Sequence, residues 1–152
     1  MLSSRKFLRL WLPVVVWMAL IYGASTNAGS SQQTSRIIDP FLRWLFPSMS
    51  AEGRAWGVVI IRKAAHLTEY AVLAMLLLRA LRQQPEPPVA GWRWHLAGAA
   101  VLGGLALSLS DELFQTFWSE RSGSLWDAAL DTLGASAGAA FFWLVGRIRR
   151  RW

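Results

Sequence analysis

Four long apolar stretches, separated by polar connections, dominate the pattern of the chain. They cover residues 7–24, 58–81, 96–118 and 125–146. A helix rises 1.5 Å per residue, so roughly 20 residues cross the roughly 30 Å of bilayer hydrocarbon. A soluble four-helix bundle keeps a polar outer face along each helix, and residues 14–21 and 135–145 have none. The pattern predicts an all-α membrane protein with four transmembrane helices, in a single domain over residues 1–152.

The long first connection, residues 26–57, holds a further predicted element. The pair Asp39-Pro40 predicts a helix start, because Pro is favoured at the first helical position. Several apolar side chains predict that this short helix lies at the membrane interface. They are Ile37, Ile38, Phe41, Leu42, Leu45 and Phe46.

The first apolar stretch has an alternative interpretation. Residues 5–28 resemble a cleaved signal peptide, with small residues at 24–28 as the cleavage region. The apolar part is long for a signal peptide, and this length favours a retained anchor.

Composition and the distribution of charge predict how the spans are oriented in the membrane. The chain is 54% hydrophobic and 16% charged, carries a net charge of +7, and contains no Cys, which excludes disulfides, thiolate metal sites and a Cys nucleophile. Positive charges gather before the first span, between the second and third, and after the fourth: Arg5, Lys6 and Arg9; Arg79, Arg82 and Arg93; Arg147 and Arg149 to Arg151. Lys and Arg at span ends stay cytoplasmic. We therefore expect both termini in the cytoplasm, and a topology signal rather than a nucleic-acid site.

Charged residues also occur inside the predicted spans, where each costs about 2.5–3.5 kcal/mol near the midplane. The second span carries Arg62, Lys63, His66 and Glu69, the third Asp111, Glu112 and Gln115, and the fourth Asp127 and Asp131. Ionisable residues within spans usually have a function. Arg62 is the exception, because its long side chain is expected to reach the interface.

Helical geometry predicts that these residues share one pocket. Counted from the outer span ends at 1.5 Å per residue, Lys63 lies about 8 Å deep, Asp131 about 9 Å and Asp111 about 10 Å. Each span turns its polar residues to one side: Lys63, His66, Glu69 and Tyr70; Ser108, Asp111, Glu112 and Gln115; Asp127 and Asp131. Gly134 and Gly138 have the spacing that lets another helix approach closely. We expect one polar pocket that opens outward.

Structural alternatives exist for several of these residues. Ser124 and Asp127 match a helix capping box. Asp131 and Asp111 could be ion-pair partners of Lys63 and Arg121, because buried pairs can fix bundle geometry without chemistry.

Three motifs in these spans resemble the VanZ-like family. They are Lys63-x-x-His66-x-x-Glu69-Tyr70, Ser110-Asp111-Glu112-x-x-Gln115 and Arg121-Ser122-Gly123-Ser124-x-x-Asp127-x-x-x-Asp131-Thr132-x-Gly134. Ser25 and the Ser-rich segment 30–35 are also similar to the family. That family, named for a teicoplanin-resistance protein, consists of integral membrane proteins without a settled reaction. The resemblance implies a multi-pass protein of the bacterial cytoplasmic membrane, and a role on lipid head groups or lipid-linked cell-wall intermediates.

Residue chemistry supports an enzyme of this kind. His66 can act as a general acid or base tuned by Glu69, while Asp111, Glu112 and Asp131 orient it. Carboxylates of this set, with Asp127, could also hold a divalent cation. An anionic head group would contact the remaining candidate residues: Lys63, Tyr70, Gln115, Arg121, Ser124 and Asp127.

Two alternatives to the enzyme remain open. One is a non-enzymatic protein that binds or transports lipid or ions, although a proton relay needs polar residues through to the cytoplasmic end. The other is a membrane assembly partner whose pocket is only an ion-pair core.

Overall fold

The computed structural model describes residues 4–83, 91–117 and 123–150. Within these ranges the chain forms helices and no strand: α1 (Ser4–Ala24), the 3-10 helix η1 (Asn27–Gly29), α2 (Ser31–Leu45), α3 (Ala51–Gln83), α4 (Trp94–Gln115) and α5 (Leu125–Ile148). Four of these helices, α1, α3, α4 and α5, are long and apolar enough to cross a membrane. The predicted all-α architecture with four such helices is confirmed.

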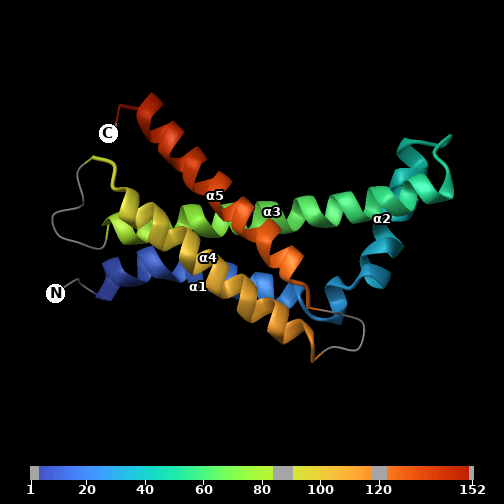
Figure 1. The fold of residues 1–152 in the computed structure, drawn as a ribbon, viewed down its shortest axis with the longest axis horizontal. Helices are drawn as coiled ribbons and strands as arrows, with labels where there is room; N and C mark the ends of the chain where they lie inside the picture. Colours follow the sequence, from blue (N-terminus) through green and yellow to red (C-terminus); the bar gives the residue numbers. More distant parts are fainter. Residues whose placement is uncertain (1–3, 84–90, 118–122, 151–152) are drawn as a thin grey trace.

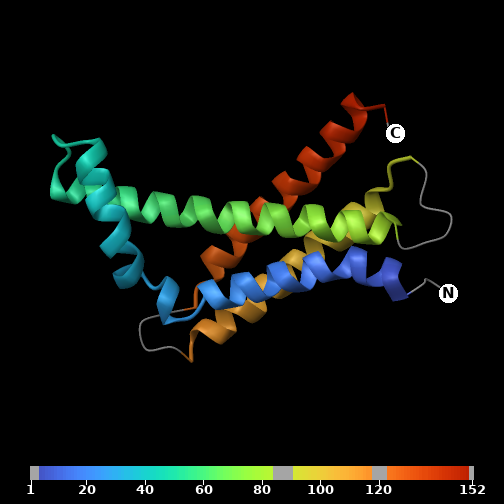
Figure 2. The same ribbon diagram turned by 180° about the vertical axis from the view of Figure 1, so that it is seen from behind.

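The long helix α3 is the axis of the bundle (Figure 1). Helices α3 and α5 run in one direction, and α1 and α4 run in the opposite one, so both termini lie at the same end (Figure 2). The C-terminal end of α3 and the start of α4 lie at that end too. We call it the basic end, because Arg9, Arg79 and Arg147 all belong to it. That the basic end faces the cytoplasm stays a prediction.

Helix α2 begins earlier than predicted. It starts at Ser31, where Ser30 is the N-cap and its hydroxyl accepts a hydrogen bond from the Gln33 amide at 3.3 Å. Pro40 is therefore inside the helix, so the predicted start at Asp39-Pro40 is wrong. A Ser side chain that caps the first amides determines a helix start more strongly than Pro, which has no amide hydrogen to donate. An interfacial position for α2 stays a prediction.

Helix α3 also begins earlier, at Ala51 instead of residue 58. Its 33 residues extend about 50 Å, well beyond the roughly 30 Å hydrocarbon layer. Helix α2 packs against these extra turns of α3, and an ion pair between Arg54 Nε of α3 and Asp39 Oδ1 of α2, at 2.9 Å, joins the two helices. Leu42 packs so closely on Gly57 that a Cβ there would lie 2.7 Å from its Cδ1. Polar residues in these turns conceal the helix start from a hydropathy pattern.

Helix α1 is an integral part of the bundle. Its buried residues Leu10, Val14 and Ile21 share one core cluster with Tyr70 and Leu73 of α3. Trp17 Nε1 donates a hydrogen bond to the Glu69 carbonyl at 2.9 Å. That this segment is retained as an anchor stays a prediction.

Small residues bring α5 against α3. A Cβ at Gly134 would overlap the backbone carbonyl of Leu67, and one at Gly138 would overlap that of Ala71. The predicted close approach is confirmed. Because the two helices are parallel, these contacts also fix which α3 residue lies level with which α5 residue.

Candidate functional site

Asp111 of α4 is fully buried at the end of the bundle opposite the basic end. Its Oδ2 accepts hydrogen bonds from Ser25 Oγ at 2.7 Å and from Gln115 Nε2 at 3.1 Å. Ser25 follows the last residue of α1, so this carboxylate joins the first span to the third. Its other oxygen, Oδ1, has no hydrogen-bond partner among the described residues.

Asp131 of α5 is the second fully buried carboxylate. Ser108 Oγ of α4 donates a hydrogen bond to its Oδ2 at 2.7 Å. Its Oδ1 lies 3.6 Å from His66 Nδ1 of α3, an ion-pair distance slightly beyond hydrogen-bond length. Ser108 thus holds one carboxylate oxygen of Asp131, and the other carboxylate oxygen faces His66.

His66 lies between this buried carboxylate and the outside. Its side chain is 23% exposed, whereas that of Asp131 is not exposed at all. A carboxylate facing Nδ1 favours the tautomer with its proton on that nitrogen, which leaves Nε2 as the basic atom. His66 is also within electrostatic range of Glu69 and Asp111. The arrangement suits a histidine that exchanges protons at Nε2.

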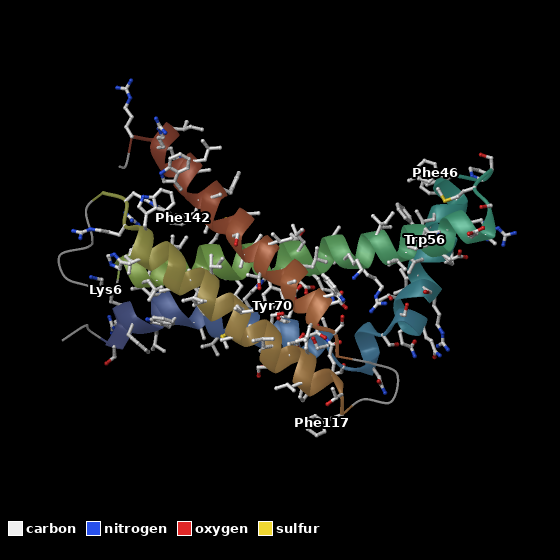
Figure 3. The ribbon with its side chains drawn as sticks, in the orientation of Figure 1. Lys6, Phe46, Trp56, Tyr70, Phe117 and Phe142 are labelled. Atoms are coloured by element: carbon white, nitrogen blue, oxygen red, sulfur yellow. The ribbon has the colours of Figure 1, made fainter. Side chains whose placement is uncertain are left out.

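Tyr70 lies one turn further along α3, where the helices of the bundle cross (Figure 3). Its side chain is completely buried, and its hydroxyl makes no hydrogen bond within the described part of the chain. The sequence places it on the His66 side of the helix, and the structure agrees.

Lys63 and Asp127 form a second pair across α3 and α5. Lys63 Nζ lies 2.5 Å from Asp127 Oδ1, and the side chains are 52% and 38% exposed. Lys63 precedes His66 by one turn, and Asp127 precedes Asp131 by one turn. The exposed Lys63–Asp127 pair therefore lies one turn farther from the basic end than His66 and Asp131. The alternative that pairs Lys63 with Asp131 is wrong. Depth counted from predicted span ends does not show which α3 residue lies level with which α5 residue. The contacts of Gly134 and Gly138 with the α3 backbone fix that register.

Glu112 binds the backbone at the start of α5. It is 5% exposed, and its Oε2 accepts a hydrogen bond from the Ser124 amide at 2.6 Å. Ser124 is the N-cap of α5 but its hydroxyl makes no capping hydrogen bond, so the capping box with Asp127 is not formed. The amide bound to Glu112 and the ion pair with Lys63 take the place of those contacts. Arg121 lies outside the described residues.

Five buried polar atoms of this site have no hydrogen-bond partner within the described ranges. They are His66 Nδ1, Tyr70 Oη, Asp111 Oδ1, Glu112 Oε1 and Asp131 Oδ1. Leaving a buried polar group unpaired costs about 1–3 kcal/mol each, so a purely structural core satisfies such atoms. Their concentration on α3, α4 and α5 in one region makes this region the candidate functional site.

A comparison with protein families shows the family to which the chain belongs. The family model described as VanZ/LLP1 matches residues 10–146, a stretch that runs from α1 to α5. The chain belongs to the VanZ/LLP1 family. No curated protein and no solved structure matches it. All the site residues described above fall within the matched stretch.

A bound divalent cation does not fit this VanZ/LLP1 protein well. No group of three or more His, Asp or Glu side chains is placed to hold a metal ion in the described part of the chain. The carboxylates are instead directed one by one at Ser25, Ser108, His66 and the Ser124 amide. We therefore derive no chemistry through a metal.

Two serines complete the site beyond the candidate residues of the sequence. Ser108 follows the predicted polar face of the third span, three residues before Asp111, so its position is readable from the helical pattern. Ser25 belongs to a connection, and only the family resemblance singles it out. Arg62 Nη2 donates a hydrogen bond to the Gly29 carbonyl at 3.4 Å. Its expected position at the membrane interface stays a prediction.

Proposed function

We propose that this VanZ/LLP1 protein is a membrane-embedded enzyme that acts on a phosphate-containing lipid or lipid-linked cell-wall intermediate. The supporting observation is a fully buried carboxylate, Asp131, held by Ser108 and directed at the partly exposed His66. In this proposal His66 transfers the proton and Asp131 positions its ring. General acid–base catalysis of this kind contributes roughly 10²–10⁴-fold to a rate.

The distance between His66 and Asp131 is compatible with this role. Catalytic hydrogen bonds are often long in a free enzyme and shorten when substrate binds. Here the Nδ1 to Oδ1 distance is 3.6 Å, so a small movement would form a hydrogen bond. Positive charge gained by the ring would be stabilised by Asp131, and Glu69 and Asp111 are near enough to contribute.

Lys63 supports an anionic substrate. Its ammonium group lies at the exposed side of the site and is paired with Asp127. A phosphate that reaches the site would exchange for Asp127 as the partner of Lys63 and would then lie one turn above His66. The start of α5 is beside this position, and helix N-termini attract phosphate. Substrate in the outer leaflet, in a bacterial cytoplasmic membrane, follows if the basic end is cytoplasmic.

The interior of the bundle argues against a transport route. Between the site and the basic end, the buried residues of α3 and α5 are apolar: Leu73, Ala74, Leu78, Ala135 and Ala139. A proton or ion path needs polar groups along its length. These buried residues give no polar path from the site toward the basic end, which suits a reaction or binding event at one membrane face.

Replacement of the two central residues tests the proposal. His66→Gln and Asp131→Asn remove the proton-transfer group and its positioning charge with little change in size. We expect both to abolish the effect of the wild-type protein on the cellular phospholipid profile, and on teicoplanin susceptibility where it confers one. His95→Gln, at the exposed start of α4, is the matched control and should behave as wild type.

The assembly-partner alternative makes a different prediction. If the pocket is only an ion-pair core, the exchanged pair Lys63→Asp with Asp127→Lys restores function, and His66→Gln has no effect when the protein inserts normally. That combination of results would refute an enzymatic role for His66.

A further inference from the structure

A cavity lies at the basic end, between the start of α1 and the end of α3. It has a volume of about 460 Å³ and is lined by Lys6, Arg9, Leu10, Arg79 and Gln83. Pockets for small molecules usually measure roughly 300–1,000 Å³. Figure 3 shows Lys6 at this end, far along the bundle from Tyr70. The cavity is therefore separate from the site around His66.

The lining of this cavity is strongly cationic. Three of its five residues are Lys or Arg, and the other two are a neutral amide and a leucine. Cations this close together repel one another, and the repulsion grows as their surroundings become less polar. An anion in the cavity would turn this repulsion into attraction.

Topology alone does not account for the arrangement. A cation that only marks the cytoplasmic side extends away from the bundle into water. Arg79 instead crosses to α1, where its Nη2 lies 3.5 Å from the Arg9 carbonyl oxygen, and its side chain is half-buried. Leu10, which is buried, closes the inner side of the cavity. Two helices thus place their cations around one partly open cavity.

The surroundings favour a lipid over a free anion. Phe7 and Leu8 flank the lining residues on α1 and are exposed. Helices α1 and α3 are both apolar enough to cross a membrane. An acyl chain can lie along these apolar side chains while its head group occupies the cavity, whereas inorganic phosphate gains only the charge interaction.

We propose that this cavity binds the phosphate head group of an anionic membrane phospholipid. Arg9 and Arg79 hold the phosphate from two helices, and the acyl chains lie along α1. Basic pockets between transmembrane helices on the cytoplasmic side are suited to anionic head groups. The bound lipid would tie α1 to α3 at the end where the Arg79 side chain reaches α1. This proposal does not depend on the reaction proposed for His66.

Native mass spectrometry of the purified full chain in detergent tests the proposal. The probes are phosphatidylglycerol, phosphatidylcholine and inorganic phosphate, each titrated separately. We expect retained phosphatidylglycerol and little phosphatidylcholine. Each neutralisation, Arg9→Gln or Arg79→Gln, should weaken phosphatidylglycerol binding about fivefold, and the double variant about thirtyfold. Arg9→Lys with Arg79→Lys keeps the charge and should retain binding.

The control removes the same charge outside the cavity. Arg5→Gln with Arg93→Gln changes two exposed cations of the basic end and should leave binding unchanged. Equal loss in this control, or equal binding of phosphatidylcholine, would overturn the proposal. Displacement of the lipid by inorganic phosphate at similar concentration would also overturn it and assign a free-anion site. Helical circular dichroism of each variant shows that the fold is kept.

Discussion

The two ends of the bundle both gather charge, but they hold it differently. At the His66 end, Asp111 and Asp131 are completely buried; Asp111 receives a hydrogen bond from Ser25, just after α1, and Asp131 receives one from Ser108 of α4. At the basic end Arg5, Arg93 and Arg149 are exposed, whereas Arg79 is half-buried and Arg82 is buried, with its Nη2 donating to the Gly91 carbonyl at 2.7 Å. Burial with partners on other helices, rather than the presence of charge, distinguishes a built site from a topology signal.

This difference has a physical cause. A charge at the end of a long flexible side chain reaches water at little cost, whereas a carboxylate on a short side chain remains where its backbone puts it. Asp111 and Asp131 therefore need donors supplied by the fold, and Ser25 and Ser108 are those donors. The His66 end should consequently be sensitive to small changes, and the basic end tolerant of them.

The largest expected effect comes from the helix contact that sets the register at the His66 end. Gly134→Leu inserts a side chain where even a Cβ overlaps the Leu67 carbonyl, so α5 must separate from α3. We expect a loss of about 3 kcal/mol or more in the free energy of unfolding, because a backbone cannot yield as a side chain does. Unfolding in detergent, followed by circular dichroism, measures it.

The matched control is Gly98→Leu near the start of α4 at the basic end. A Cβ at Gly98 meets nothing within 4 Å. This variant should be as stable as wild type or slightly more stable, because Leu favours helix over Gly. Equal damage by both substitutions would show that the close contact at Gly134 is not formed.

A smaller effect is expected from loss of one buried carboxylate. Asp111→Leu leaves the buried Gln115 amide without its Asp111 acceptor, whereas the Ser25 hydroxyl retains the Ile21 carbonyl at 3.0 Å. Unpaired buried donors cost about 1–3 kcal/mol each, so the midpoint of thermal unfolding should fall clearly. Arg5→Leu at the basic end should change stability by less than about 0.5 kcal/mol. A stable Asp111→Leu variant would contradict the assignment of a hydrogen-bonded network.

The smallest effect on stability is expected at the mouth of the site. Lys63→Ala breaks an exposed ion pair, and such pairs contribute about 1 kcal/mol or less. Its consequence should lie in substrate binding: the KM for an anionic lipid should rise, with kcat changed less. High salt should likewise raise the KM of the wild type, because it screens the attraction between Lys63 and the lipid. Lys63→Arg should preserve binding. An unchanged KM in Lys63→Ala would remove Lys63 from the substrate site.

Some helices were predictable from the sequence and others were not. Helices α1, α4 and α5 agree with the apolar stretches to within a few residues, because their polar flanks coincide with their ends. Helix α2 and the first turns of α3 consist of mixed polar and apolar sequence. The packing of α2 on these turns of α3 stabilises both as helix. Such tertiary stabilisation leaves no mark in hydropathy.

The site, too, was predictable from the sequence in part only. Which residues belong to it was predictable, since an acid within an apolar stretch needs a reason. Which residue pairs with which was not, because Gly134 and Gly138 set the register through contacts with the α3 backbone. Ser25 escaped the pattern because it lies outside every span, and only folding brings it to Asp111.

The most direct test of the central claim is a conversion assay with purified protein in liposomes made from bacterial polar lipids, with or without added lipid-linked cell-wall intermediates. Lipids before and after incubation are compared by mass spectrometry for wild type, His66→Gln and Asp131→Asn. Wild type should convert one phosphate-containing species, and both variants should remain folded and lose at least about 100-fold in rate. Equal conversion by wild type and His66→Gln would contradict a catalytic role for the buried pair.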